Sequence, residues 1–118
     1  MKYLCMIFQD EEQVKAMSQS AYDEIMNEVF AYREELRQSG HYITSSPLQP
    51  LSEAMTVQVR GGNVSVTDGP FLETREQIGG FYLIEARDLN EALRLVEKMP
   101  PARIGTIEVR ALSDYGPR

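Results

Sequence analysis

Six segments have the short apolar or alternating patterns of β-strands. Residues 2–9 are apolar at both odd and even positions, which is typical of a central strand covered on both faces. Two alternating segments, 55–60 and 63–68, are separated by a glycine turn and predict a hairpin. A short edge strand is expected at Tyr42 and Ile43, and two further strands are expected over 81–87 and 106–112.

Two segments have the spacing of amphipathic helices. The first runs from about 21 to 38, where Ser20 resembles an N-cap and Gly40 supplies a left-handed stop. Its apolar stripe consists of Tyr22, Ile25, Met26, Val29, Tyr32 and Leu36. The second covers 89–99, begins after a capping Asp88 and ends before a pair of prolines.

The order of these elements predicts a single α+β domain over residues 1–118. With the hairpin set aside, the order is β-α-β-β-α-β, the ferredoxin-like arrangement of an antiparallel sheet with two helices on one face. The hairpin is expected to add an extra strand. Because the other sheet face stays open, we expect two copies to pair through their sheets as a homodimer.

The net charge of −6 is concentrated in one part of the chain. Residues 10–35 hold eight acidic and two basic side chains, a difference of six, and the remaining residues hold ten of each. Several of these acids lie on the polar side of the first predicted helix and mark it as the solvent side. The acidity argues against direct nucleic-acid binding, which needs clustered lysine and arginine.

Composition indicates the cellular compartment of the protein and limits the metal sites that it could form. Cys5 has no second cysteine to pair with, and together with His41 it cannot build a closed zinc site. No apolar run is long enough to span a membrane, and the apolar start is too short for a secretory signal. Phosphate loops and dinucleotide glycine patterns are absent. We expect a cytoplasmic protein without membrane contact, metal or cofactor.

Two residues are candidates for catalysis. Asp68 precedes Gly69 and Pro70 at a strand end, where its carboxylate could face a cleft as a general base or only cap its own turn. His41 is the one imidazole of the chain and suits proton transfer. Its position directly after a helix end also fits a plain contact with the helix dipole and the last carbonyls.

Five residues are candidates for ligand binding. Arg33 interrupts the apolar stripe of the first helix, where it could bind an anionic group or extend past the helix end to solvent. Arg60, near a strand end, could steady an anion or form a cross-strand ion pair. Phe71 and Tyr82 could line a pocket or join the core, and Glu73 lies in a charged loop that also fits a solvated face.

The segment VTDGPFLETREQIGGFYLIEARDLNEAL, continued by TIEVR, resembles the DGPF family of YCII-related proteins. The resemblance covers nearly the whole chain and implies a ferredoxin-like fold of the dimeric α+β barrel type, with a cleft between sheet and helices. It implies homodimers and places Asp68, Phe71, Glu73 and Glu76 in the family motif. The wider family pairs a histidine on the first helix with an aspartate, whereas His41 lies beyond that helix.

Two functions follow from these observations. The first is a small homodimer that binds or transforms a small molecule in a cleft near the DGPF turn. The alternative is a noncatalytic regulatory partner, for example of an extracytoplasmic-function sigma factor, because the resemblance to the DGPF branch implies that its members often accompany such factors. That partner would dock on the acidic first helix or on the sheet edge.

Overall fold

The computed structural model describes residues 1–114; the last four residues of the predicted polar tail, 115–118, lie outside this description. The strands are β1 (Lys2–Gln9), β2 (Tyr42–Pro47), β3 (Met55–Arg60), β4 (Asn63–Asp68), β5 (Gln77–Glu85) and β6 (Thr106–Ala111). The α-helices are α1 (Glu11–Lys15), α2 (Gln19–Gln38) and α3 (Leu89–Val96), and single 3-10 turns occupy Leu51–Glu53 and Pro100–Arg103.

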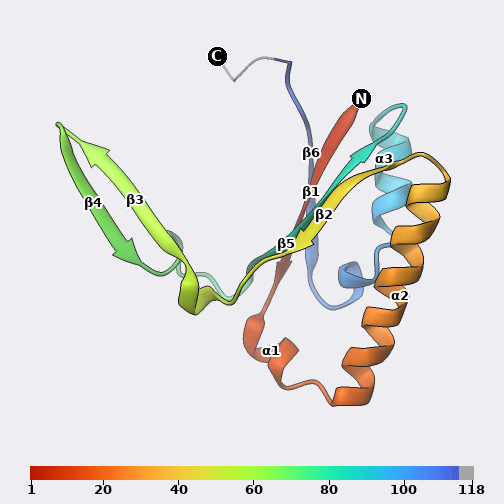
Figure 1. The fold of residues 1–118 in the computed structure, drawn as a ribbon, viewed down its shortest axis with the longest axis horizontal. Helices are drawn as coiled ribbons and strands as arrows, with labels where there is room; N and C mark the ends of the chain where they lie inside the picture. The colour runs from red at the N-terminus through yellow and green to blue at the C-terminus, as the bar shows by residue number, and fades with distance from the viewer. Residues whose placement is uncertain (115–118) are drawn as a thin grey trace.

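Four strands form an antiparallel sheet in the order β2-β5-β1-β6. Helices α2 and α3 lie together on one side of this sheet (Figure 1). The expected α+β fold with an antiparallel sheet is therefore confirmed, and the architecture is consistent with a ferredoxin-like arrangement. Among residues 1–114, no helix has the length and apolar character needed to cross a membrane.

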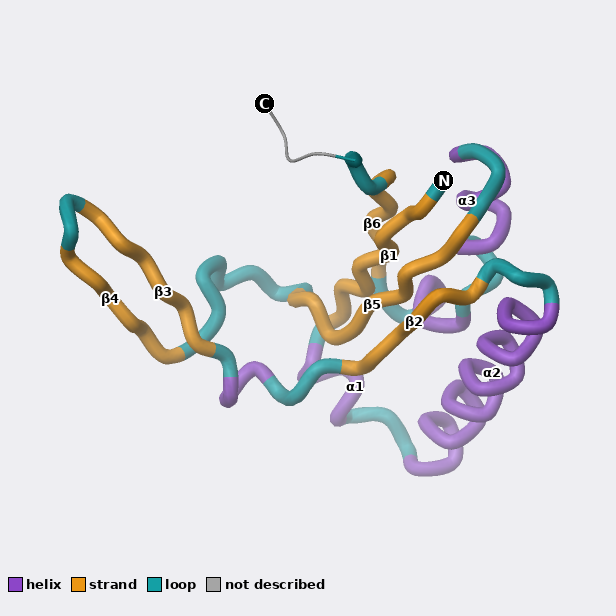
Figure 2. The backbone as a smooth tube through the Cα atoms, turned by 45° about the horizontal axis from the view of Figure 1, so that its top comes forward, coloured by secondary structure: helices purple, strands orange, loops and turns teal. Residues whose placement is uncertain are grey.

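The hairpin differs from its predicted place. Its two strands have the predicted bounds and turn, but β3 and β4 form a two-stranded sheet of their own instead of extending the main sheet. This hairpin, which we call the arm, projects away from the body of the protein (Figures 1 and 2). Alternation defines a strand but not its neighbour, so the sequence pattern alone could not distinguish these two placements.

The N-terminal ends of the helices depend on capping side chains. Helix α2 begins at Gln19, two residues before the predicted start, because Ser18 and not Ser20 accepts the backbone N–H of Ala21 at 3.2 Å. Helix α1 was not predicted, since five residues are too few to show a helical period. Asp10 caps it by accepting the backbone N–H of Glu12 at 3.0 Å.

Two other boundaries shift. Strand β5 begins at Gln77 instead of at residue 81, because the two glycines of its sequence are part of the strand. Helix α3 ends at Val96, earlier than predicted, and the chain turns into the 3-10 segment with Met99 fully buried.

The core lies between the sheet and the two long helices. Alternate residues of the central strands face it, and the buried set is Tyr3, Cys5, Tyr82 and Ile84 from the sheet with Tyr32, Leu36, Ala92 and Val96 from the helices. The other positions of β1, which are Leu4, Met6 and Phe8, are half-buried on the side of the sheet that no helix covers. We call this side the open face. The expectation that β1 is covered on both faces is therefore wrong for the single chain.

Cys5 is expected to resist thiol reagents while the protein is folded. It has no exposed surface, and burial raises the pKa of its thiol to about 11, so the thiolate is scarce at pH 8. Ellman's reagent should react with less than a tenth of the thiol within minutes at pH 8 and with all of it in denaturant. Fast reaction of the native protein would contradict this prediction.

Candidate functional site

A cavity of about 330 Å³ lies between α2 and the sheet. Its helical wall is formed by the N-terminal part of the apolar stripe, namely Tyr22, Ile25, Met26 and Val29, together with Phe30. Only Tyr32 and Leu36, further along α2, are buried in the core. The apolar stripe of this helix therefore serves two purposes, core packing at one end and a cavity wall at the other.

A pair of glycines in β5 forms part of the facing wall. A Cβ atom on Gly80 would lie 3.0 Å from the carbonyl oxygen of Ser46, so a side chain there would press on the backbone of β2. Gly79 and Gly80 both line the cavity, next to Ser45, Ser46 and Pro47 of β2. The absence of a side chain at Gly80 lets β2 pair closely with β5, and a Cβ atom on Gly79 would meet the side chain of Gln9, which also lines the cavity.

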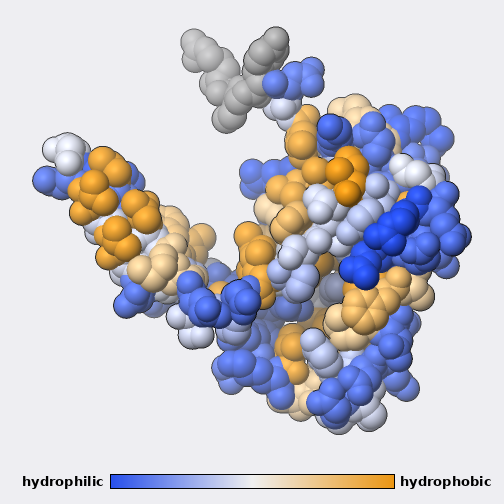
Figure 3. Space-filling model, viewed as in Figure 1, coloured by the Kyte–Doolittle hydropathy of each residue, from blue (hydrophilic) through white to orange (hydrophobic). Residues whose placement is uncertain are grey.

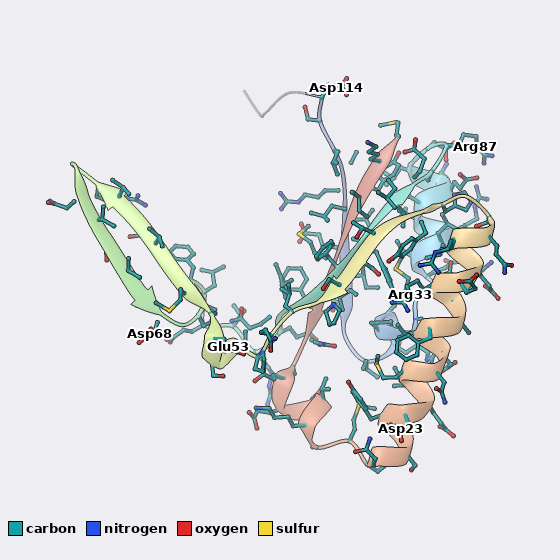
Figure 4. The ribbon with its side chains drawn as sticks, viewed as in Figure 1. Asp23, Arg33, Glu53, Asp68, Arg87 and Asp114 are labelled. Carbon is teal, nitrogen blue, oxygen red and sulfur yellow. The ribbon has the colours of Figure 1, made fainter. Side chains whose placement is uncertain are left out.

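Arg33 supplies the positive charge of this cavity. Its side chain is half-buried, and its guanidinium carbon lies 5.2 Å from the centroid of the Phe30 ring (Figure 4). Within residues 1–114 no carboxylate forms an ion pair with it, whereas the nearby Glu34 is paired with Arg37 at 2.7 Å. The charge of Arg33 is therefore available to a molecule in the cavity.

Tyr82 adds a neutral hydrogen-bond donor. Burial raises the pKa of its phenol, and the positive charge of Arg33 only partly opposes that rise. The side chain lines the cavity, and its hydroxyl has no hydrogen-bond partner in the described part of the chain. Arg33 and Tyr82, both predicted as ligand contacts, thus lie in one cavity with unused donors.

The described cavity wall contains no carboxylate, imidazole, thiol or lysine side chain. Apart from Arg33, its polar side chains are Gln9, Tyr22, Ser45, Ser46 and Tyr82. Such a lining can hold a mostly apolar molecule and hydrogen-bond an oxygen of that molecule. It does not contain a general base of its own.

The catalytic candidate Asp68 and the other predicted ligand contacts lie on or beside the arm. Asp68 is the last residue of β4 and is exposed (Figure 4). Phe71 is 68% exposed and Glu73 is also exposed. Arg60 lies at the far end of β3, where its guanidinium donates to the carbonyl oxygen of Val59 at 3.1 Å. The four residues do not line the cavity of their own chain.

The DGPF turn, residues 68–71, is well defined at the base of the arm. Gly69 has a φ of 97°, a left-handed conformation that disfavours residues with a side chain. Its carbonyl oxygen accepts the hydroxyl of Thr56 at 2.8 Å, and its backbone N–H donates to the carbonyl oxygen of Ala54 at 2.7 Å. The glycine of the motif is thus needed by the turn.

His41 lies at the C-terminal end of α2. Its backbone N–H donates to the carbonyl oxygen of Leu36 at 2.9 Å, and its Nδ1 is 2.8 Å from the carbonyl oxygen of Glu85. The carboxylate of Glu91 is 4.0 Å away. These partners belong to the helix end and the neighbouring strand, so the single chain does not bring His41 and Asp68 together as a catalytic pair.

The basic residue of the motif has a structural partner. Arg75 lies 3.2 Å from the carboxylate of Asp10, which is buried and caps α1. The ion pair connects the loop after the DGPF turn to the start of α1. Because the side chain of Arg75 is 84% exposed, solvent screens most of its contribution to stability.

Sequence reasoning missed most of the cavity wall. Ile25, Met26 and Val29 have the spacing of core residues, and the sequence alone does not show where along α2 the core ends. Two signals were present: an arginine in the middle of an apolar stripe, and two consecutive glycines leading into an apolar strand.

Comparison with known proteins identifies the family of this chain. The family model of the YCII-related domain matches residues 1–115. The chain belongs to the YCII-related family. A relative in this family, an uncharacterised protein of Rhizobium meliloti (strain 1021), is 34% identical over 119 residues, covering 99% of this chain and 96% of the relative.

A solved structure shares the fold of this YCII-related chain. It is the 5-chloro-2-hydroxyhydroquinone dehydrochlorinase from Burkholderia phenoliruptrix AC1100, in complex with 2,5-dihydroxybenzoquinone. The TM-score is 0.56 at 16% sequence identity, and the match covers 96% of this chain and 94% of that one. At this identity the likeness concerns the fold alone.

Proposed function

We propose that this YCII-related protein binds a small, mostly apolar molecule with an anionic oxygen in the cavity between α2 and the sheet. The observation that carries the proposal is Arg33, a half-buried cation in an apolar wall with no counter-ion among the described residues. A carboxylate or phenolate would satisfy its guanidinium by charge-assisted hydrogen bonds. The hydroxyl of Tyr82 offers a second donor in the same cavity.

The size and lining of the cavity favour a single ring with oxygen substituents. Its volume of about 330 Å³ lies at the small end of ligand pockets. The walls are mainly aliphatic and aromatic, and the side chains of Arg33 and Tyr82 supply hydrogen-bond donors. The ligand of the structural neighbour, 2,5-dihydroxybenzoquinone, is a ring of this kind and is therefore a suitable probe.

The cavity of the single chain is suited to binding. A reaction there would need an acid or a base from outside this cavity. The phenol of Tyr82 is neutral near pH 7, and burial raises its pKa further, so it donates a hydrogen bond and does not act as a base. Asp68, the predicted general base, lies on the arm and not in the cavity of its own chain. The single chain thus supplies recognition without acid–base chemistry.

The homodimer expected from the sequence is part of this proposal. The open face presents apolar side chains from the two central strands: Leu4, Met6 and Phe8 of β1 with Phe81 and Leu83 of β5. Pairing two open faces would remove these side chains from water. The cavity lies on the helical side of the sheet, so it would remain accessible in such a dimer.

The test compares charged and neutral rings by isothermal titration calorimetry. Benzoate and 2,5-dihydroxybenzoquinone should bind at pH 7.5, and benzyl alcohol should bind at least tenfold more weakly because it has no anionic oxygen. Arg33→Met keeps the apolar stem and removes the charge, so it should weaken the binding of both anions about 10- to 100-fold.

Arg37→Met is the matched control. Arg37 lies one turn further along α2, outside the cavity, where it pairs with Glu34 and stacks over Tyr42 at 5.0 Å. This variant should bind the anions as the unmodified protein does. Equal binding of benzoate and benzyl alcohol, or equal effects of the two arginine variants, would refute the proposed site.

A further inference from the structure

The arm has one apolar face that nothing in the described residues 1–114 covers. Val57 pairs with Val66 and Val59 with Val64, so the four valines share one face of the hairpin. Their exposures range from 56% for Val59 to 68% for Val64. The opposite face carries the polar residues Thr56, Gln58, Ser65 and Thr67.

This exposure is unusual for a hairpin. A two-stranded sheet alone in water is marginally stable and needs a further layer packed on it. The arm pairs extensively only with itself, and the radius of gyration of 16.3 Å exceeds the roughly 13–14 Å expected of a compact chain of this length. The valine face is therefore built for a layer that the single chain does not provide.

The same chain carries a second uncovered apolar surface, the open face of the main sheet. Figure 1 shows the arm and the sheet diverging from the base of the arm, and the space-filling view in Figure 3 shows a space between them. Apolar residues appear on both sides of this space in Figure 3. The valines of the arm are exposed and the side chains of the open face are half-buried, so the arm of one chain does not cover the open face of that chain.

We infer that a second copy of this chain occupies this space, so that the valine face of each arm packs against the other copy. The inference rests on the homodimer proposed above and adds the arm to its interface. In a two-fold arrangement the arm of each copy packs against the other copy. The valine face and the open face of both copies are then covered at the same time.

The charge distribution favours a second copy over an acidic or basic partner. All of the net charge of −6 belongs to residues 10–35, which form α1 and most of α2. The arm itself, residues 55–68, holds one cation, Arg60, and one anion, Asp68, and is neutral. Two copies that meet through arms and open faces therefore keep their acidic helices apart and outside.

The proposed dimer also gives the DGPF turn a structural function. The turn is at the base of the arm, where Thr56 and Ala54 hold Gly69 in position. It therefore sets the direction in which the arm leaves the body. The motif does not line the cavity between α2 and the sheet, and in this arrangement its function is to orient the arm toward the other copy.

Site-specific photo-crosslinking tests the inference directly. A benzoylphenylalanine at Val64 should crosslink to the other copy, and one at Ser65, the neighbouring position on the polar face, should crosslink at least fivefold less. Mixing ¹⁵N-labelled and unlabelled protein distinguishes crosslinks between copies from those within one chain by mass spectrometry. Crosslinks confined to one chain, or equal yields at the two positions, would overturn the inference.

Dimer stability provides the second measurement. Val57→Lys with Val64→Lys should raise the dimer dissociation constant at least tenfold in sedimentation equilibrium, whereas Gln58→Lys with Ser65→Lys should change it less than threefold. A dimer that is insensitive to the valine variants would overturn the function of the arm and leave the homodimer intact. A monomeric unmodified protein at 50 μM would refute both, and neither result would affect the binding of benzoate at Arg33.

Discussion

Replacing Leu36 by alanine is expected to lower the free energy of unfolding by about 2–5 kcal/mol, a large part of the stability of a domain of this size. Leu36 is 1% exposed and lies in the core with Tyr32, the buried strand residues and the inner side of α3. Its removal loses apolar burial and leaves a void that rigid neighbours fill only in part. Urea denaturation followed by circular dichroism measures the change.

Leu93→Ala is the control for this prediction. Leu93 lies on α3 and is 45% exposed, so the same chemical change should cost less than about 1 kcal/mol. The two variants separate the effect of burial from that of helix propensity, because both replace leucine by alanine within a helix. Similar losses from both variants would show that Leu36 does not anchor the core.

Leu36 also illustrates what the sequence could predict. The period of the apolar residues identified α2, and the capping residues placed its ends to within two positions. The alternation of 55–60 and 63–68 gave the hairpin its bounds, because local pattern and turn chemistry agree there. The sequence pattern does not show which strands pair with each other. The hairpin was therefore expected to extend the main sheet, whereas it forms a sheet of its own.

One part of the candidate site could be predicted because it departs from the local sequence pattern. Arg33 stood out because a charge in an apolar stripe needs a reason, and it lies in the cavity. Tyr82 was one of several aromatic residues on alternating strands, and it lines the same cavity as Arg33. The cavity itself depends on how far the helix stands from the sheet along its length, which is a tertiary property.

Asp68 and His41 show the opposite case. Each has the chemistry of a catalytic residue, and each also fits a structural position by its neighbours in sequence. The structure gives His41 the partners expected at a helix end and places Asp68 at the base of the arm. Residue type indicates what a side chain can do, whereas the fold determines which molecule it can reach.

Tertiary packing explains why residue 105 is a glycine, although no turn requires one there. Gly105→Ala is expected to lower the free energy of unfolding by about 1–3 kcal/mol. A Cβ atom there would run into the backbone carbonyl oxygen of Phe8, next to the point where Phe8 pairs with Thr106 at the start of β6. Backbone in a sheet cannot yield without weakening that pairing, so thermal unfolding should occur several degrees lower.

Gly79→Ala is a demanding control, because its Cβ would overlap a neighbour just as severely. That neighbour is the end of the flexible Gln9 side chain and not backbone, so Gln9 can rotate away and the loss should stay below about 1 kcal/mol. Equal losses from the two variants would mean that β6 does not approach β1 as described. Because Ile104, adjacent to Gly105, lines the cavity, the alanine at 105 should also weaken benzoate binding by disturbing one wall while leaving Arg33 in place.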